Sequence, residues 1–295
     1  MTPAPAPRLL LLPSMAYRDA GDRAGPRVRT SRRGFLVASA LAAVALGACS
    51  TPDAVAARPE GLLDPQRRRV ADAVISTFEN STVDLPYAQA QRLGDGRGIT
   101  AGRAGFTSGT RDLLLVVRRY EASAGGATPL TRFVRPLERI DAAGGGSSTR
   151  GLDGFEDVWR TTSQTDPRLD QAQDAVYDEL YFRPAMDLAR GAGQVTGLGQ
   201  LVVLDTAVQH GRGGPDGLQA LITETGAQPD PTTWLGRFLQ VRRAHLQDPA
   251  NEETTEVWRE SIPRVDTLET LLRKRRFELD TPLTWDFAGD RFSLA

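Results

Sequence analysis

The chain has 295 residues, of which 40% are hydrophobic and 25% charged, so it can fold around a sizeable core. A single cysteine excludes an intramolecular disulfide, and two histidines argue against a His-rich metal site. Seven arginines and two acids precede Cys49, which leaves acids in excess over the rest of the chain. A mildly acidic domain attracts polycations and repels nucleic acid. We therefore expect no metal, no other cofactor and no nucleic-acid partner.

The N-terminus has the features of an export signal. Residues 1–30 hold five prolines and no hydrophobic periodicity, which predicts disorder. The string SRRGFL at 31–36 leads into an apolar run over residues 35–48, and this arrangement resembles a twin-arginine signal. The run is shorter than the roughly 20 residues that a spanning helix needs. The sequence thus predicts a twin-arginine signal peptide over residues 1–48.

The apolar run ends in LGAC at 46–49, which resembles a bacterial lipobox with Cys49 as the lipidated residue. The alternative is an ordinary signal peptide that happens to contain a cysteine. Lipid chains on Cys49 would hold the protein to a bilayer, with residues 49–59 as a flexible tether. We expect an extracellular protein on the outer face of the membrane, which it contacts only through this anchor.

Two acids early in the domain suggest a particular chemistry. A helix is predicted from Pro65 past Phe78, because Asp64 suits the N-cap and apolar residues recur every four positions. Glu79 follows at the edge of this apolar stripe. Asp95 lies sixteen residues later, in a loop with glycines at 94, 96 and 98. One acid on a helix and one on a shaped loop can face each other across a substrate, as glycoside hydrolysis requires.

The remaining segments predict a mainly α-helical fold with at most a small β element. Apolar periodicity indicates helices at 111–122, 130–140, 154–161, 167–190, 197–211, 213–226, 233–246 and 263–275. The helix at 167–190 is expected to bend before Pro184. No alternating strand pattern longer than a few residues is found. The four tryptophans are interpreted as core residues.

The segment 197–211 is apolar on nearly every face, which indicates a central buried helix. Asp205 lies in its middle, and a buried carboxylate without a partner is costly. It therefore needs a cationic partner, and the planar fork of arginine suits a carboxylate better than lysine does. The helices at 233–246 and 263–275 offer Arg242 and Arg264 for this purpose.

Seven short motifs follow one another along the chain: FENS at 78–81, GDGRGIT at 94–100, GFTSGTRD at 105–112, GQLVVLDTAVQHG at 199–211, FLQVRRA at 238–244, PRVDT at 263–267 and PLTW at 282–285. Together they resemble the chitosanases of glycoside hydrolase family 46, over nearly all of residues 61–292. The resemblance implies a two-lobed, lysozyme-like catalytic domain over residues 60–295, with the substrate cleft between the lobes. We expect this domain to be a monomer.

The resemblance also implies endo-hydrolysis of β-1,4-linked glucosamine in chitosan, with inversion at the anomeric carbon. Glu79 matches the general acid and Asp95 the general base. Thr100 matches the threonine that positions the attacking water. Arg97 and Asp112 match substrate-binding positions, with Asp112 facing a sugar ammonium. Independently of the resemblance, Asp112 is in the first turn of a predicted helix and can serve as its cap.

A buried ion network behind the acid is also implied. Asp205, Arg242 and Arg264 match its members, and Glu256 is a further candidate. This agrees with the arginine partners that Asp205 requires on physical grounds.

The chain departs from the family pattern between the two acids. It is two residues shorter there, and Leu85 stands where an aromatic is expected. Gln91 and Arg92 occupy a place where an acid is expected. A basic residue at this place would weaken ammonium binding, so partly acetylated chitosan or a related amino-sugar polymer remains an alternative substrate.

Two other functions stay open from the sequence. One is a lysozyme-like peptidoglycan muramidase or lytic transglycosylase, which a lipoprotein anchor would suit; a transglycosylase does not need Asp95. The other is a non-catalytic carbohydrate-binding lipoprotein, which would have no use for Glu79, Asp95 and Thr100 together.

Overall fold

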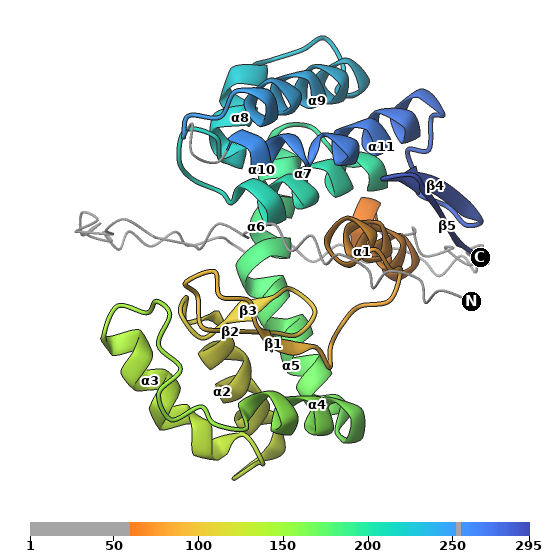
Figure 1. Cartoon of the computed structure of the whole chain (residues 1–295). Coiled ribbons are helices and arrows are strands. Elements are labelled where there is room, and N and C mark those ends of the chain that lie inside the picture. The colour runs from red at the N-terminus through yellow and green to blue at the C-terminus, as the bar shows by residue number, and fades with distance from the viewer. Residues whose placement is uncertain (1–59, 252–254) are drawn as a thin grey trace, which may run out of the picture. The chain divides into compact units, whose positions relative to one another are not determined.

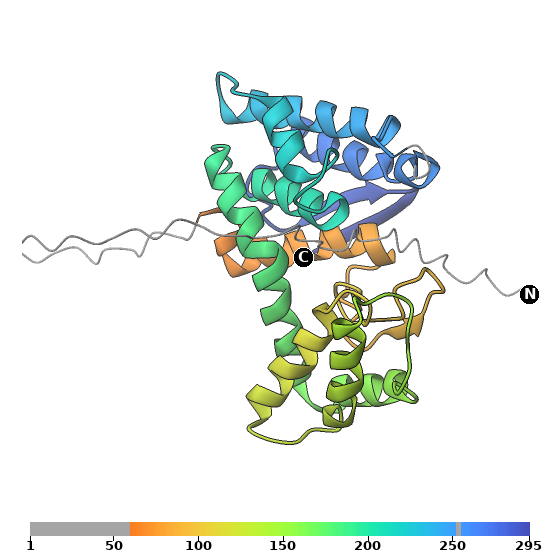
Figure 2. The same cartoon turned by 90° about the vertical axis from the view of Figure 1, so that its left-hand side faces the viewer.

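A computed structural model describes residues 60–251 and 255–295 of the chain. The predicted signal peptide, Cys49 and the tether up to residue 59 lie outside these residues. All described residues belong to one compact unit. Figures 1 and 2 show its elements in two groups, one over residues 90–165 and the other over residues 61–80 and 197–294. A continuous helical rod over residues 167–191 runs between the two groups.

The first helix, α1 (Pro65–Asn80), begins and ends as its sequence predicts. The Asp64 carboxylate accepts hydrogen bonds from the backbone N–H of Gln66 and Arg67, and Pro65 occupies the first helical position. Ser81 ends the helix in the left-handed conformation. The short 3-10 helix η1 (Gly61–Leu63) precedes it. The prediction that α1 carries Glu79 in its last turn is confirmed.

A small antiparallel sheet follows, with strand order β1 (Ala90–Arg92), β2 (Ile99–Ala101) and β3 (Phe106–Thr107). Gln91 pairs with Thr100, and Thr100 pairs with Thr107. The loop between β1 and β2 contains Asp95 and has positive φ angles at all three of its glycines. At Gly98 (φ +78°) a Cβ atom would come within 2.2 Å of the Ser108 hydroxyl, so only glycine fits there.

The other predicted helices are present, with shifted ends. They are α2 (Asp112–Ala124), η2 (Thr131–Phe133), α3 (Val134–Ala142), α4 (Phe155–Thr165), α7 (Gly197–His210), α8 (Leu218–Thr225), α9 (Pro231–Gln247), α10 (Thr255–Arg259) and α11 (Ile262–Arg273). Of these, the short α10 was not predicted; it lies between the helices expected at 233–246 and 263–275. The mainly α fold is therefore confirmed.

The predicted long helix at 167–190 is interrupted by a π-helical segment. It consists of α5 (Pro167–Tyr177), the π-helix η3 (Asp178–Phe182) and α6 (Arg183–Gly191). Pro184 has no N–H to donate to the preceding turn, and the wider π turn accommodates this loss. The structure therefore has a π turn at the place where a bend was expected.

A C-terminal hairpin was missed from the sequence. Strands β4 (Leu283–Phe287) and β5 (Asp290–Leu294) pair around a two-residue turn at Ala288 and Gly289, both with positive φ. In β4 the residues alternate strictly between buried and exposed, which is the signal that could have found the strand. Trp285 on its inner face donates a hydrogen bond to the Thr77 hydroxyl, 3.1 Å away.

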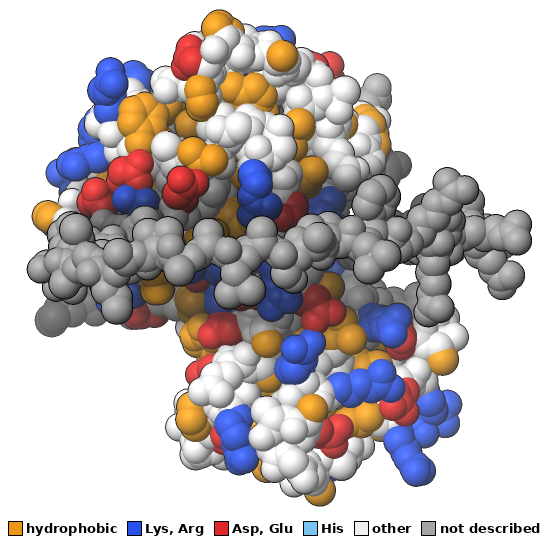
Figure 3. Space-filling model, turned by 180° about the vertical axis from the view of Figure 1, so that it is seen from behind, with side chains coloured by type: hydrophobic (Ala, Val, Ile, Leu, Met, Phe, Trp, Pro, Cys, Tyr) orange, Lys and Arg blue, Asp and Glu red, His pale blue; other side chains and the backbone are white. Residues whose placement is uncertain are grey.

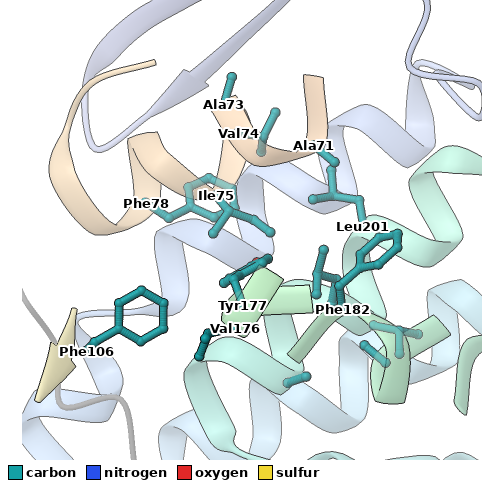
Figure 4. Close-up of a cluster of buried hydrophobic side chains, with 14 of the residues drawn as sticks. Ala71, Ala73, Val74, Ile75, Phe78, Phe106, Val176, Tyr177, Phe182 and Leu201 are labelled. Carbon is teal, nitrogen blue, oxygen red and sulfur yellow. The ribbon is translucent and has the colours of Figure 1, made fainter. Parts of the chain in front are cut away.

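The core is continuous beneath α1. Figure 4 shows apolar side chains of α1, including Ile75 and Phe78, with Tyr177 of α5, Phe182 of η3 and Leu201 of α7. All four tryptophans are buried, as predicted. None of the helices within residues 60–251 and 255–295 is both long and apolar enough to cross a bilayer. Acidic and basic side chains are interspersed on the face seen in Figure 3.

Candidate active site

A pocket lies where α1 faces the small sheet. Its lining includes Ile75 and Glu79 of α1, Gln91 and Thr100 of the sheet, Tyr177 of α5 and Val208 of α7. We call it the Glu79 pocket. Arg97, from the loop between β1 and β2, and Arg103, from the loop between β2 and β3, also line it. Three of the residues singled out from the sequence, Glu79, Arg97 and Thr100, therefore share one pocket.

Glu79 forms an ion pair with a buried arginine. Its side chain is 18% exposed, and Arg264 donates a hydrogen bond from Nη2 to Glu79 Oε1. The Arg264 side chain is 1% exposed and comes from α11. Because one carboxyl oxygen is fixed by this charge-assisted bond, the other oxygen has a defined direction.

Asp205 pairs with both arginines that its burial was predicted to require. Its Oδ2 lies 2.7 Å from Arg242 Nη2 and its Oδ1 lies 3.5 Å from Arg264 Nη1. The Asp205 and Arg242 side chains are fully buried. With Glu79, the network contains two acids and two arginines, so its formal charges cancel. A buried charge is tolerated only with such compensation.

Glu256 was a wrong prediction for this network. It is exposed in the first turn of α10, where its charge faces water near a helix N-terminus instead of the buried arginines. The outer partners of Arg242 are Gln209, whose Oε1 accepts from Nη2, and His210, whose Nε2 lies 3.3 Å from Arg242 Nε. They follow Asp205 by four and five residues on α7, a spacing that the sequence already contained.

His210 is a neutral part of the network. It is 2% exposed, and burial lowers its pKa well below the usual value, with the Arg242 charge acting in the same direction. Arg242 Nε donates to the Nε2 atom, so the proton of the neutral ring lies on Nδ1. That atom donates to the Asp216 carbonyl oxygen, 2.8 Å away.

His245 is hydrogen-bonded to the loop before α8, which contains Asp216. Its Nδ1 lies 2.7 Å from Asp216 Oδ1 and its Nε2 lies 2.8 Å from Glu224 Oε2 of α8. Burial alone would lower the pKa of His245, but the hydrogen bonds to Glu224 and Asp216 raise it above the usual value. Protonated His245 therefore bridges α9 to α8 and to the loop before it.

This bridge predicts a pH-dependent stability. The folded-state pKa of His245 is raised, so its contribution is fully present below the unfolded value of about 6.5 and is lost as pH rises through the folded value. We expect His245→Gln to lower the free energy of unfolding by about 1 kcal/mol near pH 5.5 and by much less near pH 9. Urea unfolding at both pH values measures this, and an equal loss at both would contradict it.

Asp95 is held by Arg97 in the exposed loop. The Arg97 backbone N–H donates to Asp95 Oδ1 at 3.1 Å, and its Nε and Nη2 atoms donate to Oδ2 at 2.9 and 2.6 Å. The Asp95 side chain is 28% exposed. Arg97 thus orients the Asp95 carboxylate. Arg97 lines the Glu79 pocket, whereas Asp95 is not among the residues that line it.

Thr100 lines the Glu79 pocket and carries a buried hydroxyl. It is 4% exposed, and its Oγ1 atom has no hydrogen-bond partner among the described residues. Buried polar atoms without a partner are uncommon and indicate a place that water or a ligand fills. This matches the water-positioning role that the resemblance implies.

Asp112 is the first residue of α2, and its carboxylate accepts from an N–H group of the first turn, while the N-cap residue Arg111 makes no capping side-chain bond. Asp112 Oδ1 accepts hydrogen bonds from the N–H groups of Thr107 and Leu113 and from the Thr110 hydroxyl. Burial raises the pKa of Asp112 to about 6, against the opposing effect of these hydrogen bonds. Asp112 thus satisfies one N–H group in the first turn of α2, and the same carboxyl joins the β3 strand to α2.

A second ionic cluster was missed from the sequence. Arg103, with a side chain 5% exposed, lies 3.1 Å from Asp72 of α1 and is also paired with Asp174 of α5. The Tyr87 hydroxyl donates to Asp174 at 2.8 Å. This cluster ties one wall of the Glu79 pocket to both α1 and α5. No short motif marks it, because its members are far apart in the sequence.

Comparisons with known proteins agree on one family. The model of glycosyl hydrolase family 46 matches residues 73–283. A chitosanase of Bacillus subtilis strain 168 is 40% identical over 232 residues, which are 76% of this chain and 82% of the relative. A chitosanase of Streptomyces sp. strain N174 is 32% identical over 270 residues, covering 87% and 92% of the two chains.

Solved structures give the same result. A family 46 chitosanase of Gynuella sunshinyii in complex with chitotetraose has a TM-score of 0.69 at 42% identity, covering 78% of this chain and 98% of that chain. The native chitosanase of Bacillus subtilis MY002 also has a TM-score of 0.69, at 37% identity and with the same coverage.

Proposed function

Because the chain belongs to glycosyl hydrolase family 46, we propose that this glycoside hydrolase is an endo-acting chitosanase that inverts the anomeric carbon. The chitosanases to which it is similar cover most of its length. The observation that carries the proposal is the Glu79 pocket, whose lining includes both the carboxyl fixed by Arg264 and Thr100, with its unpartnered hydroxyl. Such a pocket can hold a sugar and a water molecule next to a carboxyl group that donates a proton.

In this mechanism Glu79 protonates the glycosidic oxygen as the bond to the anomeric carbon breaks. Arg264 occupies Oε1, so Oε2 is the oxygen that transfers the proton. Asp95 removes a proton from the attacking water, which Thr100 positions on the opposite face of the sugar. Inversion needs room for that water, so the two carboxyl groups should be about 6.5–9.5 Å apart in the productive complex.

The acids also suit the substrate. Chitosan is a polycation below the pKa of its amines, and the chain beyond Cys49 has more acids than bases. Developing positive charge on the sugar ring is stabilised by a nearby carboxylate. Asp112 and Arg97 belong to the substrate-binding part of the proposal, and the protein is proposed to act as a monomer without a cofactor.

The proposal extends to location. The SRRGFL string, the apolar run after it and Cys49 support twin-arginine export and lipid attachment on the outer membrane face. Export in the folded state suits a domain that forms no disulfide. Metabolic labelling with a fatty acid should mark the wild-type chain and leave a Cys49→Ser chain unmarked.

The activity is tested with full-length protein on chitosans of graded acetylation and on peptidoglycan. We expect a rapid fall in chitosan viscosity and no turnover of peptidoglycan. Proton NMR during the first minutes should show the α-anomer at new reducing ends, because a β linkage is cleaved with inversion. Anhydro-sugar ends would identify a transglycosylase, and no turnover of any chitosan would overturn the proposal.

A further inference from the structure

Gln91 and Arg92 are neighbours on β1 but face different surroundings. Side chains alternate between the two faces of a strand. Gln91 lines the Glu79 pocket, whereas the Arg92 guanidinium is bound to Glu156 of α4, with Nε 2.6 Å from Oε1, and to the Thr149 hydroxyl. Arg92 is thus drawn away from the pocket and neutralised, so the residue that bears on the substrate is Gln91.

Gln91 and Thr100 form a neutral polar surface inside the pocket. They are direct partners in the register of β1 and β2. Gln91 Nε2 and Thr100 Oγ1 are both buried, and neither has a hydrogen-bond partner among the described residues. An amide N–H and a hydroxyl without partners, side by side in a cavity, need acceptor groups from a ligand or from water.

The charged groups of the pocket are already paired. Glu79 is bound to Arg264, Arg97 to Asp95, and Arg103 to Asp72 and Asp174. An ammonium group beside Gln91 would therefore not find a carboxylate that lacks a cation. A neutral substituent that carries a carbonyl oxygen would instead satisfy the amide donor.

We propose that Gln91 is a specificity-determining residue that admits an N-acetylated sugar beside Thr100. In one orientation its Nε2 donates to the acetamido carbonyl oxygen. Rotated by half a turn, the same amide presents Oε1 to the ammonium of glucosamine, so both units are accepted. This inference rests on the proposed chitosanase function. A carboxylate at position 91 could accept from the ammonium but could not donate to the acetamido group.

The test compares wild type with Gln91→Glu on fully deacetylated chitosan and on extensively acetylated chitosan. We expect the ratio of kcat/KM for the acetylated over the deacetylated polymer to fall at least about tenfold in the variant. Mass spectrometry of the products should show fewer N-acetylated units next to the cleaved bond. The matched control is Gln219→Glu, the same charge change at an exposed position of α8, which should leave the ratio within about twofold of wild type.

The possible outcomes distinguish a failure of the Gln91 assignment from a failure of the proposed chitosanase function. If wild type cleaves no chitosan, the proposed function fails. If wild type is active and Gln91→Glu keeps the same ratio, the function stands and the assignment of Gln91 is overturned. A variant with the wild-type unfolding midpoint that turns over neither polymer would also overturn it, since Gln91 would then act on the reaction and not on specificity.

Discussion

Glu79→Gln should lower kcat on chitosan by about 10³-fold, because glutamine keeps the shape of the side chain but has no proton to give to the leaving oxygen. It also removes one of the two negative charges that face Arg242 and Arg264. We therefore expect a further loss of about 1–3 kcal/mol in the free energy of unfolding. Initial rates of reducing-end formation and thermal unfolding measure the two effects separately.

The magnitudes show which effect controls the rate. A domain with a stability of about 5–15 kcal/mol stays almost entirely folded after a loss of that size, so unfolding cannot produce a 10³-fold decrease. Asp95→Asn provides the comparison, because Asp95 is in an exposed loop outside the buried network. It should reduce kcat by a similar factor but change stability by less than about 0.5 kcal/mol. A Glu79→Gln enzyme with more than a tenth of wild-type kcat would refute the role of Glu79 as the acid.

The sequence was most informative where one residue imposes a physical demand. Asp205 in an apolar helix required buried cations, and the structure supplies Arg242 and Arg264. The N-cap residue before α1 and the proline at its first position determined where that helix begins, and hence where Glu79 lies. In both cases the cost of an unsatisfied polar group leaves few alternatives, so the prediction did not depend on distant packing.

The sequence was least informative where contacts between distant segments determine the position of a side chain. The cluster of Arg103 with Asp72 and Asp174 joins three segments that no local pattern connects. From the sequence, Arg92 was expected to weaken binding of the substrate's ammonium groups. In the structure, side chains alternate between the faces of β1, and Arg92 forms an ion pair with Glu156 instead. Glu256 was assigned to the network by resemblance, yet the network is completed four and five residues further along α7 by Gln209 and His210.

Asp205→Asn should lower the free energy of unfolding by about 3–5 kcal/mol, the largest stability effect that we expect from a single isosteric change. Asparagine keeps the volume of the side chain but leaves Arg242 and Arg264 buried with only Glu79 to balance them. For a domain of this size the melting temperature should fall by about 10 °C. Chemical denaturation with a fixed m-value measures the change.

Two further variants distinguish charge imbalance from local damage. Asp286→Asn removes the same group from an exposed pair with Arg291 and should change stability by less than about 0.5 kcal/mol. Combining Asp205→Asn with Arg242→Gln restores a neutral site, in which Arg264 keeps Glu79, and should recover part of the lost stability. If Asp205→Asn is no more damaging than Asp286→Asn, the network does not support the acid. If the double variant is worse than the sum of the single ones, packing and not charge is the reason that Asp205 is needed.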